Sequence, residues 1–248
     1  MTSKQIVLLL TVMVGAAPLW FAAGCTVPTP VVRPESPYAG RRVFAVAPFR
    51  NESGSAHADG VRVADRFAAE LARVRGLDTL PVNRTLDTMA GLGLTDVSSV
   101  DDARRLLAAL GADGLVVGSV TAYDPYDPPV LGLAVELYLG GADDRRPDGP
   151  DPRALQRAGR LPDAEADRRR RADPGPASAI AGHYAASDPD TDALLTAYAV
   201  ERGPDGTGEM TRRRYRGSID LFTEFVGFQL TERLMDAERR RRRDPFSP

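Results

Sequence analysis

The chain has one cysteine, Cys25, and two histidines, His57 and His183, in 248 residues. A single cysteine cannot form a disulfide within the chain, and so few Cys and His residues cannot supply a structural zinc site. No Gly-x-Ser-x-Gly motif is present, and no pair of carboxylates stands out for acid–base catalysis. The composition therefore predicts no catalytic centre, no metal site, no cofactor and no small-molecule substrate.

Lysine is almost absent, because Lys4 is the only one and arginine supplies every other basic side chain. The formal net charge is −2, so the charge balance gives no reason to expect a nucleic-acid partner. Two arginine runs, Arg168–Arg171 and Arg239–Arg243, could bind an anionic lipid, a polymer or a nucleic acid. We interpret both as solvated charge, since the first lies among carboxylates and the second follows a helix whose C-terminal dipole favours cations.

The longest apolar run, Ile6–Val14, is interrupted only by Thr11 and is too short for a stable membrane span. Lys4 precedes it and small residues follow it, which is the order of an export signal. Residues 1–24 are therefore predicted to be a signal peptide.

Phe21-Ala22-Ala23-Gly24-Cys25 resembles a lipobox, the motif in which small residues precede a cysteine that is acylated and becomes the mature N-terminus. Ala22 stands where leucine is usual, and the alternative is an ordinary signal peptide with a cysteine by chance. The resemblance implies a palmitate-bearing Cys25 that anchors the chain to a membrane, since two acyl chains give stable binding. By resemblance to bacterial lipoprotein sorting, the absence of Asp directly after the cysteine, where this chain has Thr26, is compatible with delivery to the outer membrane, facing the periplasm.

The mature chain is predicted to hold one domain on a tether. Residues 25–40 are rich in proline and typical of a semi-rigid linker, and the domain spans 41–238. Residues 140–176 are dense in charge, Pro and Gly, which predicts a mobile insert, and 239–248 form an arginine-rich tail expected to be disordered.

Apolar patterning within the domain predicts alternating strands and helices. Leu115–Val120 is continuously apolar, as in a central strand, and Val130–Leu139 alternates, as in a half-buried antiparallel strand. Strands are expected at 43–49, 78–82, 115–120, 130–139 and 177–184, and helices at 58–75, 83–89, 100–110, from 187 onward and at 217–238. This order predicts an α/β fold, a single-domain mixed sheet packed with helices.

Two segments carry a family resemblance. Val43–Ser53 resembles the first strand and loop of envelope proteins related to the TolB N-terminal domain, a group that includes CsgG and LpoB. Gly111–Val120 resembles the Ala-Asp-hydrophobic-Gly strand of the same group, and the similarity covers about residues 42–139. It implies a TolB N-terminal-like fold and a place in the bacterial cell envelope.

Two polar features are candidate interaction sites. Asn51 and Glu52 follow the first strand, where α/β sheets often place ligands, although a loop also needs such residues to turn and to cap a helix. Tyr123 and Tyr126 lie in the proline-rich segment Tyr123–Pro129, which predicts a turn that displays two tyrosines.

The sequence thus predicts a membrane-anchored envelope lipoprotein, a non-catalytic module that binds other envelope proteins. The alternative is a secretion-channel subunit similar to CsgG, but such a subunit needs long alternating hairpins, and only Val130–Leu139 alternates well. An enzyme is the third alternative, with the polar residues near Asn51 as its site.

Overall fold

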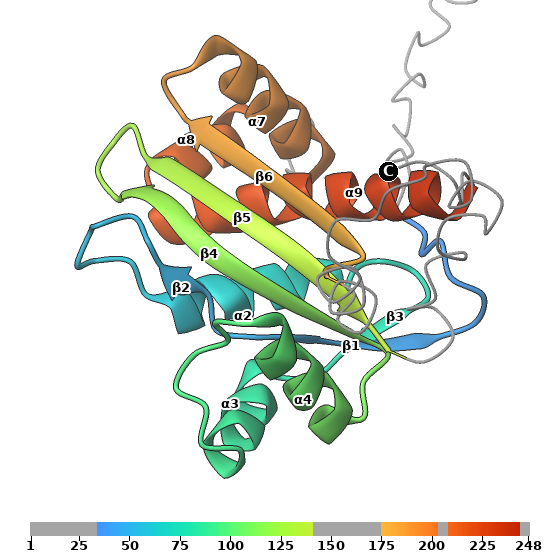
Figure 1. Ribbon diagram of the computed structural model, residues 1–248. Helices are drawn as coiled ribbons and strands as arrows, with labels where there is room; N and C mark the ends of the chain where they lie inside the picture. The colour runs from blue at the N-terminus through green and yellow to red at the C-terminus, as the bar shows by residue number, and fades with distance from the viewer. Residues whose placement is uncertain (1–33, 141–174, 203–207, 244–248) are drawn as a thin grey trace, which may run out of the picture. The chain divides into compact units, whose positions relative to one another are not determined.

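A computed structural model describes residues 34–140, 175–202 and 208–243 (Figure 1). The predicted signal peptide, Cys25, most of the tether 25–40 and nearly all of the insert 140–176 lie outside the described residues, and those predictions stand untested. The described chain folds around a six-stranded sheet that lies between two groups of helices.

The sheet is mixed, which confirms the predicted fold class. Parallel pairing joins β3, β1 and β4, and antiparallel pairing joins β4, β5 and β6, giving the order β3-β1-β4-β5-β6 with β2 added to β4. β4 lies in the middle, as its continuous apolar run predicts, and β5 has the predicted bounds. The strands are β1 (Arg42–Val46), β2 (Arg50–Asn51), β3 (Leu77–Thr79), β4 (Gly114–Asp124), β5 (Val130–Leu139) and β6 (Ser178–Ala185).

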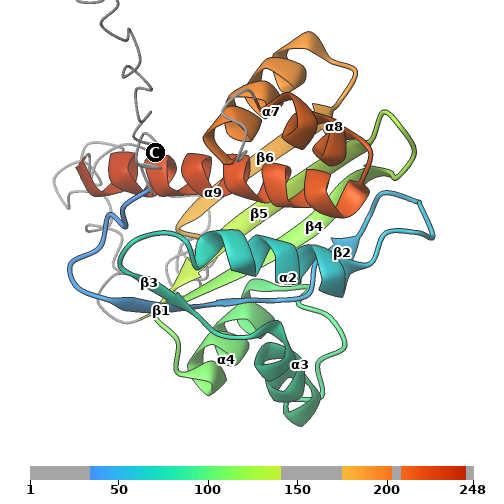
Figure 2. The same cartoon turned by 180° about the vertical axis from the view of Figure 1, so that it is seen from behind.

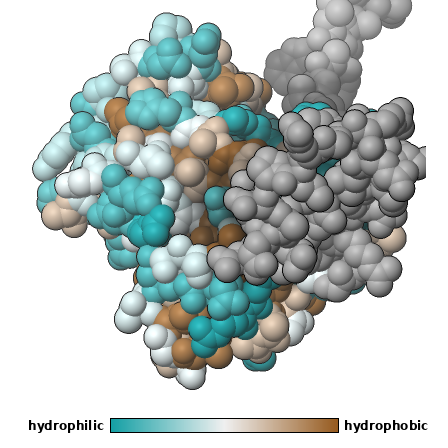
Figure 3. Space-filling model, viewed as in Figure 1, coloured by the Kyte–Doolittle hydropathy of each residue, from teal (hydrophilic) through white to brown (hydrophobic). Residues whose placement is uncertain are grey.

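Helices cover the two faces unequally. Figure 2 shows α2 and α9 crossing one face, while α3 and α4 cover the β1 side of the other. Ala179, Ala181 and His183 of β6 remain exposed on that second face, and apolar side chains show at its centre in Figure 3. The helices are α2 (Gly60–Leu71), α3 (Val82–Gly91), α4 (Val100–Leu110), α7 (Pro189–Arg202), α8 (Glu209–Arg216) and α9 (Ile219–Arg243).

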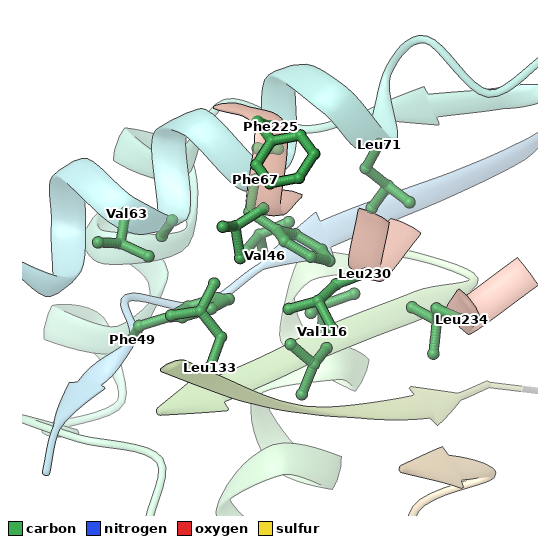
Figure 4. Close-up of a cluster of buried hydrophobic side chains, with 14 of the residues drawn as sticks. Val46, Phe49, Val63, Phe67, Leu71, Val116, Leu133, Phe225, Leu230 and Leu234 are labelled. Atoms are coloured by element: carbon green, nitrogen blue, oxygen red, sulfur yellow. The ribbon is translucent and has the colours of Figure 1, made fainter. Parts of the chain in front are cut away.

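The larger core lies between the sheet and the pair α2–α9 (Figure 4). Phe67 and Leu71 of α2 and Phe225 of α9 are fully buried against Val116 of β4 and Leu133 of β5. Burying each such side chain contributes about 1.5–3 kcal/mol, so the helical spacing of these residues on α2 and α9 fixes which faces pack.

A smaller core lies under α3 and α4. Leu106 and Leu107 of α4 pack on Leu115 of β4 and Tyr138 of β5. The predicted ends of α4 are confirmed: the Ser99 side chain accepts a hydrogen bond from the Asp102 amide, and Gly111 ends the helix at φ 61°.

Several predicted boundaries were wrong. Arg50 and Asn51 form a strand, because their backbone pairs with Ser119 and Val120, where the sequence predicted a loop. β4 continues to Asp124, so Tyr123 lies in a strand and outside the turn.

The C-terminal region also differs from the prediction. α7 begins at Pro189, where the sequence predicted a helix from 187 onward, and it is capped by Asp188, whose carboxylate accepts from the Thr191 amide. α8 was not predicted, because its residues are mostly charged and only Thr211 is buried. Arg239–Arg243 continue α9 and are not a disordered tail, since they contact the N-terminal segment and Glu238.

Candidate interaction surface at the end of the sheet

The predicted interaction residues meet at one end of the sheet, formed by the β2–α2 loop and the β4–β5 turn. We call residues 50–59 and 121–130 the hairpin end (Figure 1). Antiparallel pairing of β5 with β6 also brings the start of α7 here, because Ala185 pairs with Val130.

Tyr126 stands at the tip of the β4–β5 turn with 71% of its surface exposed. Its backbone amide donates to Asp124 Oδ1 at 3.1 Å, and Pro129 is buried below it, so the turn is held by local contacts. Tyr123 is half-buried against the larger core, where burial raises the pKa of its hydroxyl and nearby Asp220 adds to the shift. The prediction of two exposed tyrosines was therefore wrong for Tyr123, because the strand extends through it and turns its ring toward α2 and α9.

Asn51 holds the β2–α2 loop in shape. Its Nδ2 donates to the carbonyl oxygens of Ser55 at 2.8 Å and Ala58 at 3.4 Å, and its Oδ1 accepts from the Ser53 hydroxyl at 2.7 Å. Glu52 pairs with Arg50 at 2.6 Å and is exposed. The Asn51 side chain is thus occupied by turn hydrogen bonds, and the carboxylate of Glu52 faces solvent.

Gly60 is required where this loop enters α2. A Cβ there would lie 1.7 Å from the carbonyl oxygen of Phe49, whose amide in turn donates to the Gly60 carbonyl at 3.1 Å. Only glycine allows the chain that leaves β1 to pass this close to the helix.

A small cavity lies behind the loop, between α2, α9 and the end of β4. Its volume of about 30 Å³ leaves room for water molecules. Arg62 pairs with Asp220, and Arg66 pairs with Glu224 at 2.5 Å, so charged pairs join the two helices here. The cavity is too small for an organic ligand. Its lining residues are His57, Asp59, Arg62, Val63, Arg66, Tyr123, Asp220 and Thr223.

Exposed carboxylates gather around the hairpin end, and no local sequence pattern predicted this. They come from segments far apart in the chain and share a location because β2 pairs with β4 and because β4, β5 and β6 run antiparallel: Glu52, Asp59, Asp124, Asp127, Asp188 and Asp190. Asp59 and Asp188 also cap α2 and α7. The turn-forming residues of Tyr123–Pro129 could have indicated Asp124 and Asp127. Asp188 and Asp190, at the start of α7, join them only because β6 pairs with β5.

The opposite end of the sheet receives the N-terminal segment. We call residues 34–42, 73–77 and 238–243 the root end. Glu35 bridges to Arg75 through the backbone, and Arg239 Nη2 donates to the Glu35 carbonyl at 3.2 Å. The segment from Pro34 is therefore bound to the loop after α2 and to the last turns of α9.

A buried carboxylate, Glu238, fastens this junction. It is fully buried and accepts hydrogen bonds from the Tyr38 hydroxyl at 2.8 Å, from Ser178 and from Arg241 at 2.8 Å. Burial, together with the negative charge of Glu238, raises the pKa of Tyr38 well above its ordinary value. The cluster joins the N-terminal segment, β6 and α9, and no local sequence signal revealed it.

A second buried ion pair lies between α2 and α7. Glu70 accepts from Arg202 Nη2 at 3.1 Å, and the Arg202 guanidinium lies 4.4 Å from the centre of the Tyr198 ring. Burial raises the pKa of Glu70, against the opposing effect of Arg202. We interpret this ion pair as a structural contact between α2 and α7, because aromatic rings of α7, α8 and α9 surround it.

In the part of the chain that the structure describes, no helix combines the length and apolar character needed to cross a bilayer. Within the same residues, no group of three or more His, Cys, Asp and Glu side chains is arranged to hold a metal ion.

Comparisons with known proteins give partial structural matches. No protein-family model matches the chain, and no curated protein matches it in sequence. Among solved structures, lipoprotein GNA1162 from Neisseria meningitidis aligns over 65% of this chain and 96% of its own, at 15% identity and a TM-score of 0.36. The LpoB C-terminal domain from Salmonella enterica aligns over 41% and 74%, at 16% identity and a TM-score of 0.34.

A third match is the protein CT253 from Chlamydia trachomatis, over 80% of this chain and 98% of its own, at 10% identity and a TM-score of 0.33. The matched structures include a protein named as a lipoprotein and the C-terminal domain of LpoB. The α/β fold itself follows from the strand order and register described above.

Proposed function

We propose that this protein is a non-catalytic envelope lipoprotein, anchored in the membrane through acylated Cys25, that presents its hairpin end to other envelope proteins. The observation that carries the proposal is the separation of two ends: the N-terminal segment enters at the root end, and the predicted interaction residues lie at the other. The outer membrane, facing the periplasm, is the location that the lipobox and Thr26 favour.

The length of the sheet supports this arrangement. β4 runs from Gly114 near the root end to Asp124 at the hairpin end, and the ten intervals between its 11 residues, at about 3.3 Å each, span about 33 Å. An anchored domain would therefore hold Tyr126 well away from the root end and the membrane to which it is attached.

Tyr126 supports protein binding as the role of this end. An exposed tyrosine on a turn held by its own hydrogen bonds loses little conformational entropy on binding and offers both an apolar ring and a hydroxyl. The surrounding carboxylates give such a contact a charge preference, so we expect a partner surface with basic residues.

A non-catalytic role is supported by how the polar side chains at the hairpin end are used. Asn51 shapes its loop, Asp59 caps α2, and Arg62 and Arg66 pair with carboxylates of α9. Each of these contacts maintains the local structure of the hairpin end, which is the use expected of polar side chains in a contact surface.

Metabolic labelling tests the anchor. Wild-type cells grown with radiolabelled palmitate should yield a labelled protein in the membrane fraction, and Cys25→Ser should lose the label. The anchor is refuted if palmitate fails to label the wild-type chain.

Site-directed crosslinking in cells tests the surface. A photoreactive amino acid in place of Tyr126 should crosslink to a discrete envelope protein, whereas the same group in place of Ala90, exposed on α3, should not. Equal yields at the two positions would contradict the proposal. A ring-shaped oligomer in negative-stain images of detergent extracts would instead favour the channel-subunit alternative.

A further inference from the structure

The two ends of the sheet differ in charge. Exposed carboxylates gather at the hairpin end, while the root end carries exposed arginines from three separate segments. The exposed arginines of the root end are Arg41, Arg73, Arg75, Arg240, Arg242 and Arg243. The net charge of −2, which is the balance of 32 basic and 34 acidic residues, does not show this separation.

The arginines of the root end differ in how they are paired. Arg41 pairs with Asp78, and Arg73 pairs with Glu70, whereas Arg242 lies 5.2 Å from the centre of the Tyr38 ring. Arg75, Arg240 and Arg243 are exposed, and none of them has a carboxylate partner among the described residues. A cluster of arginines of this kind attracts a surface of negative charge.

The position of the cluster indicates what that surface is. The Pro34 carbonyl accepts a hydrogen bond from the Arg75 amide, and eight residues separate Pro34 from Cys25 along the chain. The cluster therefore lies on the part of the domain that an N-terminal lipid anchor would hold nearest to the bilayer.

We infer that the root end is a contact surface for anionic phospholipid, with Arg75, Arg240 and Arg243 facing the headgroups. The inference rests on the proposed function, since the anchor brings this end to the membrane. Attraction at the root end and repulsion of the acidic hairpin end act in the same sense, so both orient the domain with Tyr126 pointing away from the bilayer.

The composition alone did not support a lipid contact for Arg239–Arg243. The fold changes this, because α9 carries these residues to the same place as Arg75 and the N-terminal segment. Arg239 and Arg241 are held by Asp236 and Glu238, which orients the last turn and leaves Arg240 and Arg243 on its exposed side.

Amide hydrogen exchange of the full-length protein in vesicles tests the inference. Exchange in residues 73–77 and 236–243 should be slowed in vesicles that contain phosphatidylglycerol, relative to pure phosphatidylcholine. At about 1 kcal/mol for each arginine near the surface, we expect a slowing of about fivefold or more, lost at high salt.

Matched charge reversals identify the residues. Arg240→Glu with Arg243→Glu should abolish the difference between the two vesicle types, whereas Arg213→Glu with Arg214→Glu, on exposed positions of α8, should preserve it. Both pairs change the net charge equally. The neutral pair Arg240→Gln with Arg243→Gln should also abolish the difference. It controls for loss of the last helical turn caused by the added negative charge, and circular dichroism reports whether α9 is intact.

Three outcomes would overturn the inference: equal exchange in both vesicle types, equal effects of the two charge-reversal pairs, or loss of the protection when inorganic phosphate is added at constant ionic strength. The last result would assign the site to free phosphate. Failure of the proposed anchor can be distinguished from failure of this inference. The first would appear as an absence of palmitate label, whereas the difference between the two vesicle types is measured independently of that label.

Discussion

Tyr38 and Glu238 are separated by 200 positions in the chain and joined by one buried hydrogen bond at the root end. A buried carboxylate is costly unless several donors surround it, and here Tyr38, Ser178 and Arg241 supply them. Because each donor belongs to a different segment, a single side chain fixes where the N-terminal segment leaves the domain.

Removing the Tyr38 hydroxyl should weaken this junction. We expect Tyr38→Phe to lower the free energy of unfolding by about 1–3 kcal/mol, the cost of a lost hydrogen bond to a buried charge. Urea denaturation measures the change. The control is Tyr126→Phe, which removes a hydroxyl at an exposed position and should leave the midpoint unchanged.

Ser99 and Asp102 offer a second test at the scale of the residue. The Ser99 hydroxyl donates to Asp102 at 2.8 Å and lowers the pKa of that carboxyl below its ordinary value. A lowered folded-state pKa means that this contribution to stability is present above the unfolded pKa and is lost as the pH falls through the folded pKa.

In Ser99→Ala, the pKa of Asp102 should therefore rise toward its ordinary value, and the loss of the helix cap should cost about 1 kcal/mol. An NMR titration of the Asp102 carboxyl measures the first effect, and thermal unfolding measures the second. An unchanged Asp102 titration would show that Ser99 does not set its pKa.

At the scale of the element, α9 organises the larger core. Phe225 lies within 6.0 Å of the Tyr184, Tyr198 and Phe222 rings, measured between ring centres, and it is fully buried. One helix thereby contacts β6, α7 and its own preceding turn through a single aromatic side chain.

Phe225→Ala should destabilise the protein by about 3–5 kcal/mol, the range for truncating a buried aromatic side chain. Met210→Ala, on an exposed residue of α8, is the matched control and should change stability by less than about 0.5 kcal/mol. Similar midpoints for the two variants in chemical denaturation would contradict the packing described for α9.

Elements with strong local patterns were predictable from the sequence, and elements defined by their neighbours were not. The helical spacing of α4 and α9 and the alternation of β5 gave their positions, since burial on one face leaves a periodic trace. β2 has only two residues and exists through its pairing with β4. α8 is short and mostly charged, and its single buried residue is Thr211, so neither element has an apolar pattern that would mark it in the sequence.

The candidate surface was predictable in its residues but not in its assembly. Turn-forming residues marked the loop after Asn51 and the segment around Tyr126, yet their proximity depends on the register of β2 with β4. The half-buried position of Tyr123 depends on the length of β4, and the gathering of exposed carboxylates at the hairpin end depends in part on the antiparallel return of β5 and β6.

At the scale of the whole molecule, stability and binding should be separable, because they reside in different places. Tyr126→Ala should leave the unfolding midpoint unchanged while the proposed partner, once identified by crosslinking, is recovered at a lower yield with the variant in co-purification. Asn83→Ala, exposed on α3, is the control and should keep the wild-type yield. A large loss of stability in Tyr126→Ala would instead place Tyr126 in the core of the turn.

The parallel pairing of β1 has a mechanical consequence. β1 lies between β3 and β4, and the N-terminal segment continues from its first residue at the root end. A pull between a membrane anchor and a partner held at Tyr126 would act along the strands, so the hydrogen bonds on both sides of β1 would be loaded together in shear. Resistance would then come from several bonds at once, which would help the domain stay folded under a load applied between its two ends.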